Sequence, residues 1–569
     1  MSRLFTILSA LLLVACSSDP ADDTAASAPP TQTTPVISPA SAGLAAELLG
    51  RIDADTAALW LSLEPLPQPL LDQLWAQMAA MSELSESAYE DMAAETEHPL
   101  LSALLVELGQ LTSPEDYAER GININGVAGA HMVSIFPLLH WELSDQDAFA
   151  ATLARIEADA ELNLPRRRIE DQELIWVDLE TFGLAIHHDQ HFLTIGLVPD
   201  REDLLRRVAN LDRATSALRS AEVNAFNTAR GLRNDNSGFV DFQRLLRLLL
   251  DGEDELLVQA RADGALAQLA QDPACRTELE QLTTTFPRKS YGTTALSATS
   301  MSMQVRLETD SGFGTRLSAL ADSPVALPAQ RAGLLNFGMA FNLIAARDFG
   351  RALVGGWVEN PPQCFLFQGI AEQASDWQLA LNRPIPPLVT NLHGSRIHID
   401  RVEIDNGQPV DVTGTIALFM RNPQMMLGMA QMFSPELAAL DLRPGAPPQP
   451  VPSGLAPALG DIPAWLGLSE TGLGLAIGAG QDAALPEALI AGSADSAIFA
   501  MGFDLARYGE LLQLGAGAMP VPGGAPADFD PGEAADMMQL LAGIYSYLHQ
   551  SVHLTPDGID MLVRLDLKD

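Results

Sequence analysis

The most regular pattern in the chain is an alternation of large and small side chains that occurs twice. Residues 337–343 read Phe-Gly-Met-Ala-Phe-Asn-Leu, and residues 499–505 read Phe-Ala-Met-Gly-Phe-Asp-Leu. A period of two is typical of a β-strand that presents one bulky face and one small face. Asn342 and Asp504 then stand where a side chain can cap the amino terminus of a helix. The pattern therefore predicts a strand, a cap and a helix at both places.

Weaker matches extend this repeat over most of the chain. Five pairs of segments occur in the same order, at separations that run from 258 to 291 residues. The pairs are Glu64 with Asn342, Asp241 with Asp504, 144–148 with 422–426, 183–186 with 474–477, and 305–308 with 563–566. Ordered matches with drifting separations indicate a tandem duplication whose loops have changed length. We therefore expect two similar halves, 44–325 and 326–569; one large domain with chance similarities is the alternative.

Each half is expected to be α+β, with antiparallel strands and helices packed on one side of the sheet. Two segments read as β-hairpins, 182–197 and 552–567, and the second turns at Pro556-Asp557-Gly558. The bulky face of the repeated strand would then lie beneath the helices. It would form either a filled core or the wall of a cavity.

The first residues have the pattern of an export signal. Arg3 precedes an apolar run from Leu4 to Val14, which is too short for a permanent membrane span. Residues 1–15 are therefore predicted to be removed, and the mature chain to begin at Cys16. Residues 16–43 are rich in Ala, Pro, Thr and Ser without a hydrophobic period, which predicts a disordered tether.

Leu13-Val14-Ala15-Cys16 resembles the lipobox of bacterial lipoproteins. The resemblance implies a diacylglycerol thioether and an acylated amine, such as a palmitoyl amide, on Cys16. Ser17 after the cysteine implies sorting to the outer membrane of a Gram-negative cell, on its periplasmic face. Residues 55–67 also resemble a segment of an uncharacterised family of large exported lipoproteins. That second resemblance implies no activity.

Composition excludes one large class of partners. The chain has 33 basic and 73 acidic residues, a net charge of −40. Nucleic-acid affinity depends mainly on basic groups that neutralise phosphates, so a nucleic-acid partner is not expected.

Cys275 and Cys364 remain as a pair once Cys16 is acylated. In an oxidising compartment an even pair predicts a disulfide. The alternative is two buried free thiols.

For three other clusters of residues we prefer a structural role to a functional one. Residues 187–191 read His-His-Asp-Gln-His and could bind zinc or copper, but they are expected to form a hairpin tip with exposed imidazoles. Three methionines at helical spacing, Met425, Met429 and Met432, are expected to pack in a core. The basic run 166–168 is expected to be a solvated loop. No metal or other cofactor is predicted.

Motifs of known enzyme classes are missing from the sequence. It has no Gly-x-Ser-x-Gly elbow, no His-Glu-x-x-His and no Gly-x-x-x-x-Gly-Lys. The leading hypothesis is a non-catalytic, outer-membrane-anchored lipoprotein that binds or scaffolds another envelope component. The first alternative is a carrier or sensor of a lipid or another apolar molecule. An envelope hydrolase is the second, and it would need convergent titratable groups in a cleft.

Overall fold

The computed structural model describes residues 39–79, 89, 92–94, 96, 99–159, 163–179, 182–262, 266–321, 333–340, 342–405, 408–490, 497–515 and 541–568. The signal segment and Cys16 lie outside these residues. The first described helix, α2, is Pro39–Leu49, so the last five residues of the expected tether are helical. None of the described helices is both long and apolar enough to cross a bilayer.

The chain divides into two compact units. Among the described residues, the N-terminal unit contains 39–299 and 303–305, and the C-terminal unit contains 300–302 and 306–568. The division falls within strand β10 (Ser300–Glu308), earlier than the expected boundary after residue 325. The reason is that the end of β10, like the residues that follow it, packs on the last hairpin of the chain. Arg306 forms a buried, two-contact ion pair with Asp560, at 2.5 and 2.7 Å.

The described part of the N-terminal unit contains nine antiparallel strands in the order β4-β5-β6-β7-β3-β2-β1-β8-β9. Their bounds are β1 Ala58–Ser62, β2 Ala128–Val133, β3 Phe136–Glu142, β4 Arg166–Ile169, β5 Gln172–Leu179, β6 Phe182–His188, β7 Phe192–Val198, β8 Ser237–Asp241 and β9 Arg288–Ser297. The helices are α2, α3 Gln68–Ala79, α5 Pro99–Gly109, α6 Pro114–Glu119, α7 Gln146–Asp159, α8 Glu202–Val208, α9 Ser220–Arg230, α10 Phe242–Asp251, α11 Glu255–Ala262, α12 Ala267–Gln271 and α13 Pro273–Thr285.

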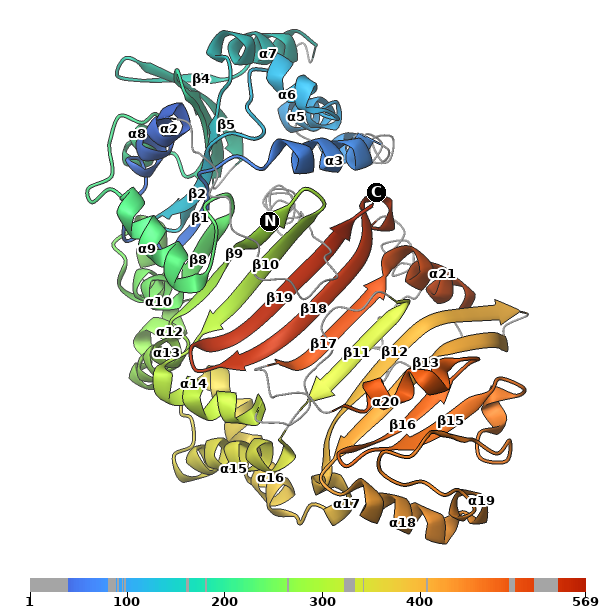
Figure 1. Ribbon diagram of the computed structural model, residues 1–569. Helices are drawn as coiled ribbons and strands as arrows, with labels where there is room; N and C mark the ends of the chain where they lie inside the picture. The colour runs from blue at the N-terminus through green and yellow to red at the C-terminus, as the bar shows by residue number, and fades with distance from the viewer. Residues whose placement is uncertain are drawn as a thin grey trace. The chain divides into compact units, whose positions relative to one another are not determined.

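Helices cover both faces of the N-terminal sheet around β5–β7, so the expectation of helices on one side is wrong for this unit. Ile175 and Ile186 pack with Phe149 of α7 on one face. Leu174 and Ala185, their immediate neighbours, contribute to the core formed with α8 on the opposite face. Figure 1 shows α7 and α8 on either side of these strands. Adjacent apolar residues along β5 and β6 are the reason, because such strands are buried on both sides.

Among its described residues, the C-terminal unit also contains nine antiparallel strands outside the divided strand β10, in the order β14-β15-β16-β13-β12-β11-β17-β18-β19. Their bounds are β11 Leu335–Ala340, β12 Leu392–Asp405, β13 Gln408–Met420, β14 Gln449–Pro450, β15 Ala464–Leu468, β16 Gly472–Ile477, β17 Ala497–Asp504, β18 Tyr545–Thr555 and β19 Gly558–Leu567. The helices are α14 Ser311–Ser318, α15 Leu343–Glu359, α16 Gln368–Asn382, α17 Pro387–Thr390, α18 Pro423–Phe433, α19 Pro435–Ala438, α20 Leu485–Ala488 and α21 Leu505–Gly515.

Both faces of the repeated strand contribute to the C-terminal core: the small face packs on α20, and on the bulky face Phe503 is buried against Tyr508 of α21. Ala340 and Ala500 pack with Leu485 of α20. Small residues allow this close approach: a Cβ added at Gly474 would lie 2.7 Å from the Leu485 side chain. On the bulky face Met339 is 37% exposed. The expected burial of that face beneath helices is therefore wrong for Met339.

Three of the four helix caps that the repeat predicts are present, whereas Glu64 accepts a hydrogen bond from the Asn234 side chain and the helix that follows begins only at Gln68. The side chain of Asn342 accepts the N–H of Ala345, and the side chain of Asp504 accepts the N–H of Arg507. Asp241 caps α10 in the same way. Both predicted hairpins also form, as β6–β7 and β18–β19.

Candidate ligand-binding site

Cys275 and Cys364, the predicted pair, are disulfide-bonded. Cys275 lies in the first turn of α13, where the Asp272 side chain caps the helix, and both cysteine residues are fully buried. The disulfide prediction is confirmed.

The histidine cluster forms the predicted hairpin tip between β6 and β7, but not all of its imidazoles are exposed. His187 is buried, and its Nδ1 lies 3.1 Å from the Glu173 carbonyl. Burial lowers the pKa of His187. His191, at the tip, pairs with Glu47 at 2.8 Å. The turn is fixed by Asp189, whose carboxylate accepts two backbone N–H groups and pairs with Arg51. Among the described residues, no group of three or more His, Cys, Asp or Glu is arranged to hold a metal ion.

The methionine and arginine clusters also differ from expectation. Met432 on α18 is 74% exposed and Met425 is 42% exposed, so these two are not core residues. The core side of α18 is formed by Leu427 instead. Residues 166–168 belong to the short strand β4, not to a loop, and Arg166 pairs with Glu157 and Glu173.

Sequence reasoning missed a pair of buried histidines in the N-terminal sheet. His131 and His140 stack with their Nε2 atoms 3.2 Å apart, and the Nδ1 of His140 lies 3.0 Å from the Thr194 hydroxyl. Burial, and then the charge of Arg207, lowers the pKa of His131 to about 3. The side chains are almost completely inaccessible. They are neutral core groups that no substrate can reach in this conformation.

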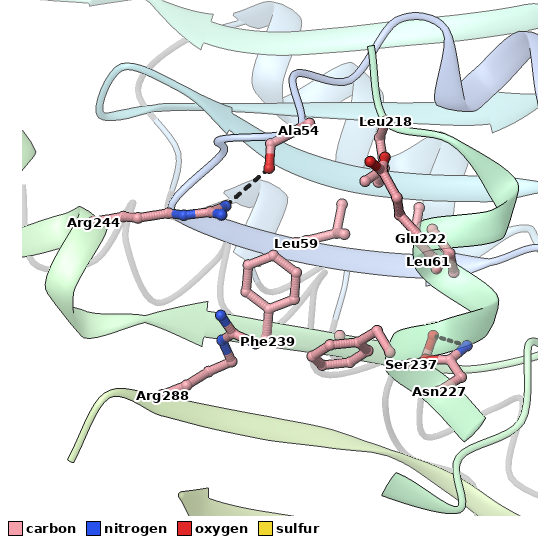
Figure 2. Close-up of a pocket in the computed structure, with 13 residues that line it drawn as sticks. Ala54, Leu59, Leu61, Leu218, Glu222, Asn227, Ser237, Phe239, Arg244 and Arg288 are labelled. Atoms are coloured by element: carbon pink, nitrogen blue, oxygen red, sulfur yellow. Dashed lines mark hydrogen bonds between the residues drawn. The ribbon is translucent and has the colours of Figure 1, made fainter. Parts of the chain in front are cut away.

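An open cavity of about 140 Å³ lies elsewhere in the N-terminal unit, between α9 and strands β1 and β8 (Figure 2). Leu59 and Leu61 of β1 pair in register with Phe239 and Ser237 of β8, so these side chains share one face of the sheet. Helix α9 lies over that face. The thirteen lining residues are Ala54, Leu59, Leu61, Leu218, Glu222, Val223, Phe226, Asn227, Ser237, Gly238, Phe239, Arg244 and Arg288.

Local sequence explains how α9 is placed over the sheet. The Glu222 carboxylate accepts the N–H of Arg219 and so caps the helix start. Val223, Phe226 and Asn227 follow at helical spacing and all face the cavity. Gly231 ends the helix with a left-handed φ of 69°, which turns the chain toward β8.

The wall of the cavity is aromatic. The rings of Phe226 and Phe239 are 5.4 Å apart, tilted by 52°. The guanidinium of Arg288 lies 5.1 Å from the centre of the Phe239 ring, within the range of a cation–π contact. Arg230 stacks on Phe226 at 3.9 Å. These contacts hold charged groups against an otherwise apolar surface.

Two guanidinium groups lie at one end of the cavity. Arg244 donates to the carbonyl oxygens of Ala54 and Thr56, at 2.9 and 3.1 Å. Arg288 donates to the carboxylate of Asp241 at 2.9 Å. Figure 2 shows both guanidinium groups on one side of Phe239, with Asn227 and Ser237 on the other. The site is therefore apolar in its middle and polar at both ends.

The signal for this site in the sequence is weak. The sequence around Phe239 and Asp241 indicates a strand followed by a helix cap, and both are present. It does not indicate that Phe239 lines a cavity. Arg288 is 49 residues downstream of Phe239, and no local pattern links the two. The helical spacing of Val223, Phe226 and Asn227 shows that one face of α9 is turned toward the protein. It does not show that a cavity lies beneath that face.

Comparisons with known proteins give little additional information. No protein-family model matches the chain, and no curated protein matches it. Two crystal structures of TP0453 are similar to part of it. Crystal form III has 10% identity over 50% of this chain and 89% of its own, and crystal form IV has 11% identity over 46% and 80%. Both TM-scores are 0.23, which is too low to establish a common fold.

Proposed function

We propose that this protein is a non-catalytic binding component of the cell envelope that holds a small, largely apolar ligand in the cavity beneath α9. The observation that carries the proposal is the cavity itself, an open space lined by leucine, valine and phenylalanine side chains. Ligand sites are concave and mostly apolar, with a few polar groups that fix orientation. The cavity is small for a lipid with two chains, which favours a smaller apolar molecule.

Native mass spectrometry of gently purified protein tests this function. We expect a bound molecule that is lost in Val223→Phe, because the larger side chain fills the cavity. Val258→Phe is the matched control, since Val258 is 49% exposed on α11 and does not line the cavity. Leu218→Phe, at the cavity wall, gives a second test if Val223→Phe does not fold. Retention of the same molecule by both cavity variants would contradict the proposal.

A lipid anchor on Cys16 is the second part of the proposal, and it rests on the lipobox resemblance. Several acyl chains make such an anchor stable. The expected localisation is the periplasmic face of the outer membrane. Cys16→Ser should release the protein from the membrane fraction and abolish incorporation of labelled palmitate. A Cys16→Ser product that still pellets with membranes would contradict the anchor.

Scaffolding of another envelope component is the alternative function. Met432 and Phe433 at the end of α18 are 74% and 86% exposed, and exposed apolar groups are typical of interaction surfaces. Affinity purification from crosslinked envelopes would recover a reproducible partner under this alternative. Met432→Ser with Phe433→Ser should then abolish recovery, whereas the cavity variants should not.

We also propose that the two units arose by tandem duplication. Eight of the nine strands in each unit follow the same order. In this order, β5-β6-β7-β3-β2-β1-β8-β9 corresponds to β14-β15-β16-β13-β12-β11-β17-β18, and β4 has no counterpart. Equivalent hydrogen bonds support this correspondence. Asp241 N–H donates to the Ala57 carbonyl, and Asp504 N–H donates to the Leu334 carbonyl. Counted from these bonds, Leu59 of β1 corresponds to Asn336 of β11.

Turns at equivalent places are also built alike. Asp189 N–H donates to the Phe192 carbonyl at the β6–β7 turn, and Ser469 N–H donates to the Gly472 carbonyl at the β15–β16 turn. The equivalent of the histidine tip is therefore the turn that begins at Ser469. In the same way β16 corresponds to β7, so the sequence match of 183–186 with 474–477 joins strands at different positions in the two sheets.

A further inference from the structure

Helix α18 is exposed on most of its surface although it carries no charged residue. Only Pro423 and Leu427 of its eleven residues are buried. Met425, Met432 and Phe433 are all exposed. A helix that faces water usually carries polar and charged residues on its solvent side. The exposed side of α18 therefore has the composition of a surface that meets an apolar medium.

The two helices before α18 also expose apolar side chains. Trp377 and Leu379 on α16 and Val389 on α17 are exposed. The start of α18 lies beside the end of α17, because the Asn391 side chain donates to the Asn422 carbonyl at 3.2 Å and accepts the Asn422 N–H at 2.9 Å. Figure 1 shows α16, α17 and α18 in succession along one edge of the C-terminal unit. We call this region the helical edge and define it by Trp377, Leu379, Val389, Met425, Met432 and Phe433.

Acidic residues are missing from the sequence around the helical edge. No Asp or Glu occurs between Asp376 and Asp400 or between Asp411 and Glu436, although 73 of the 569 residues of the chain are acidic. The two acid-free segments lie side by side, because the part of β12 in the first pairs with the part of β13 in the second. The helical edge therefore lacks the negative charge that the rest of the chain carries.

The charged residues beside the exposed apolar groups are basic. Arg383 directly follows α16 and Arg421 precedes α18 by one residue, and both are exposed. Arg421 donates to the imidazole of His393 at 3.3 Å, not to a carboxylate. Basic groups beside exposed apolar side chains are typical of surfaces that bind anionic lipids. The apolar groups enter the boundary between headgroups and acyl chains, and the basic groups meet the phosphates.

We infer that the helical edge is a membrane-docking surface, which inserts Met425, Met432 and Phe433 among the headgroups of a bilayer and places Arg383 and Arg421 against lipid phosphates. A second copy of the chain is a poorer occupant. A twofold contact would bring like arginines together with no carboxylate between them. A lipid surface supplies both an apolar layer and phosphate groups. The inference depends neither on the cavity beneath α9 nor on the acyl anchor.

Vesicle flotation of the predicted mature chain, 16–569 with Cys16→Ser, tests this surface without an acyl anchor. That chain keeps every residue that the structure describes. We expect it to float with vesicles of phosphatidylcholine and phosphatidylglycerol in equal amounts, and more weakly with phosphatidylcholine alone. Met432→Ser with Phe433→Ser should weaken binding by about tenfold or more, since two large apolar side chains no longer leave water. Val106→Ser with Val258→Ser, at exposed valines of the N-terminal unit, is the control.

The arginines give a second variant, whose effect depends on lipid charge. Arg383→Gln with Arg421→Gln should weaken binding to the mixed vesicles by about tenfold or more, and should change binding to phosphatidylcholine little. Added salt should reproduce this loss, because it screens the attraction between the arginines and the phosphates.

Three results would overturn docking on lipid. The first is equal flotation of the parent chain, the serine variant and the valine control, or no flotation of the parent. The second is self-association in sedimentation velocity without lipid that the serine variant abolishes, which would assign the helical edge to a second copy. The third is a protein partner held through α18 without vesicle binding, which would favour scaffolding. Native mass spectrometry of the cavity variants is independent of all three, so failure here leaves the proposed ligand site intact.

Discussion

The two units place different chemistry on equivalent strand positions. In the N-terminal unit, Leu59 pairs with Phe239 and Asp241 pairs with Arg288. In the C-terminal unit, the equivalent pairs are Asn336 with Gly502 and Asp504 with Tyr547. The apolar residues of the first set border an open cavity. In the second set, Asn336 and Tyr547 are hydrogen-bonded to each other.

In the C-terminal unit, Tyr547 occupies the space above the glycine. A Cβ added at Gly502 would lie 2.7 Å from the Tyr547 hydroxyl. Asn336 donates to that hydroxyl at 2.6 Å and accepts from His398 at 2.5 Å. Burial raises the pKa of Tyr547 to about 12, so the phenol stays protonated at neutral pH. A similar strand order thus surrounds an open cavity in one unit and a hydrogen-bonded polar chain in the other.

A histidine is present at one equivalent position in both units but has different surroundings. His131 pairs with Leu59, and His398 pairs with Asn336. The His131 ring contacts another imidazole, whereas His398 lies between the Asn336 amide and the Asp400 carboxylate, at 2.5 and 2.7 Å. The two histidines therefore occupy matching register positions but have different surroundings.

Exchanging residues between the units is the most severe test of whether the equivalent positions require different side chains. Leu59→Asn places an amide among Leu48, Leu61 and Phe239. We expect a loss of about 4 kcal/mol in the free energy of unfolding, from lost leucine contacts and an unpaired polar group. Urea unfolding followed by hydrogen exchange should show lower protection in β1 and β8. A loss below about 1 kcal/mol would mean that the site tolerates the polar chemistry of the other unit.

The reverse exchange should cost slightly less. Asn336→Leu removes the hydrogen bonds to His398 and Tyr547, so we expect a loss of about 3 kcal/mol. Lower protection is expected in β11 and β17, with the N-terminal unit unaffected. Asn360→Leu, at an exposed position after α15, is a control for the same chemical change. Equal effects of both variants would remove the special role of Asn336.

Low pH should destabilise the N-terminal unit through its buried histidines. The pKa of His131 is about 3 in the folded protein because of burial, whereas an unfolded histidine has a pKa of about 6.5. Below pH 6.5 the unfolded state therefore binds a proton that the folded state does not. Between pH 7 and 5 this difference costs about 2 kcal/mol for His131 alone. His140 adds to the loss, because burial, His131, Arg51 and Arg207 also lower its pKa.

His131→Gln sharpens this prediction. Urea midpoints at pH 8, 7, 6 and 5 should fall less steeply for the variant than for the wild type, because glutamine binds no proton. The pH 8 values isolate the packing difference between the two proteins. Parallel pH profiles would show that His131 does not contribute.

The smallest effect is expected from Tyr547→Phe. Loss of the hydroxyl removes one hydrogen bond to Asn336, which we expect to cost about 1 kcal/mol. The spectrophotometric alkaline titration should also lose one tyrosine that ionises near pH 12. Tyr508→Phe is the matched control, since the structure shows its ring against Phe503. An unchanged titration would contradict the assignment of the raised pKa to Tyr547.

The sequence predicted local structure well. Asn342 and Asp504 cap the helices that follow their strands, and Pro556-Asp557-Gly558 turns the last hairpin. Such features depend on residues within one turn of each other. The disulfide was also predictable, because an even pair of cysteines in an expected oxidising compartment favours a disulfide over free thiols.

Exposure was not predictable from local pattern. Met425 and Met432 have helical spacing, yet a spacing does not show whether another element covers that face. The alternation at Met339 defines two faces of the strand, but it does not show which face the helices cover. The cavity joins α9, β1, β8 and Arg288, segments far apart in sequence. Its open space is a property of their packing, which no single segment contains.

The contrast in exposure between the end of α18 and the end of β13 has a practical consequence in redox chemistry. Thioether oxidation requires contact with the oxidant, so dilute peroxide should convert Met432 to its sulfoxide long before Met420, which is 5% exposed at the end of β13. The two sulfur atoms then act as an internal pair of reporters. Their relative oxidation, read by peptide mass, would show whether a bound partner shields α18 or whether the sheet has opened.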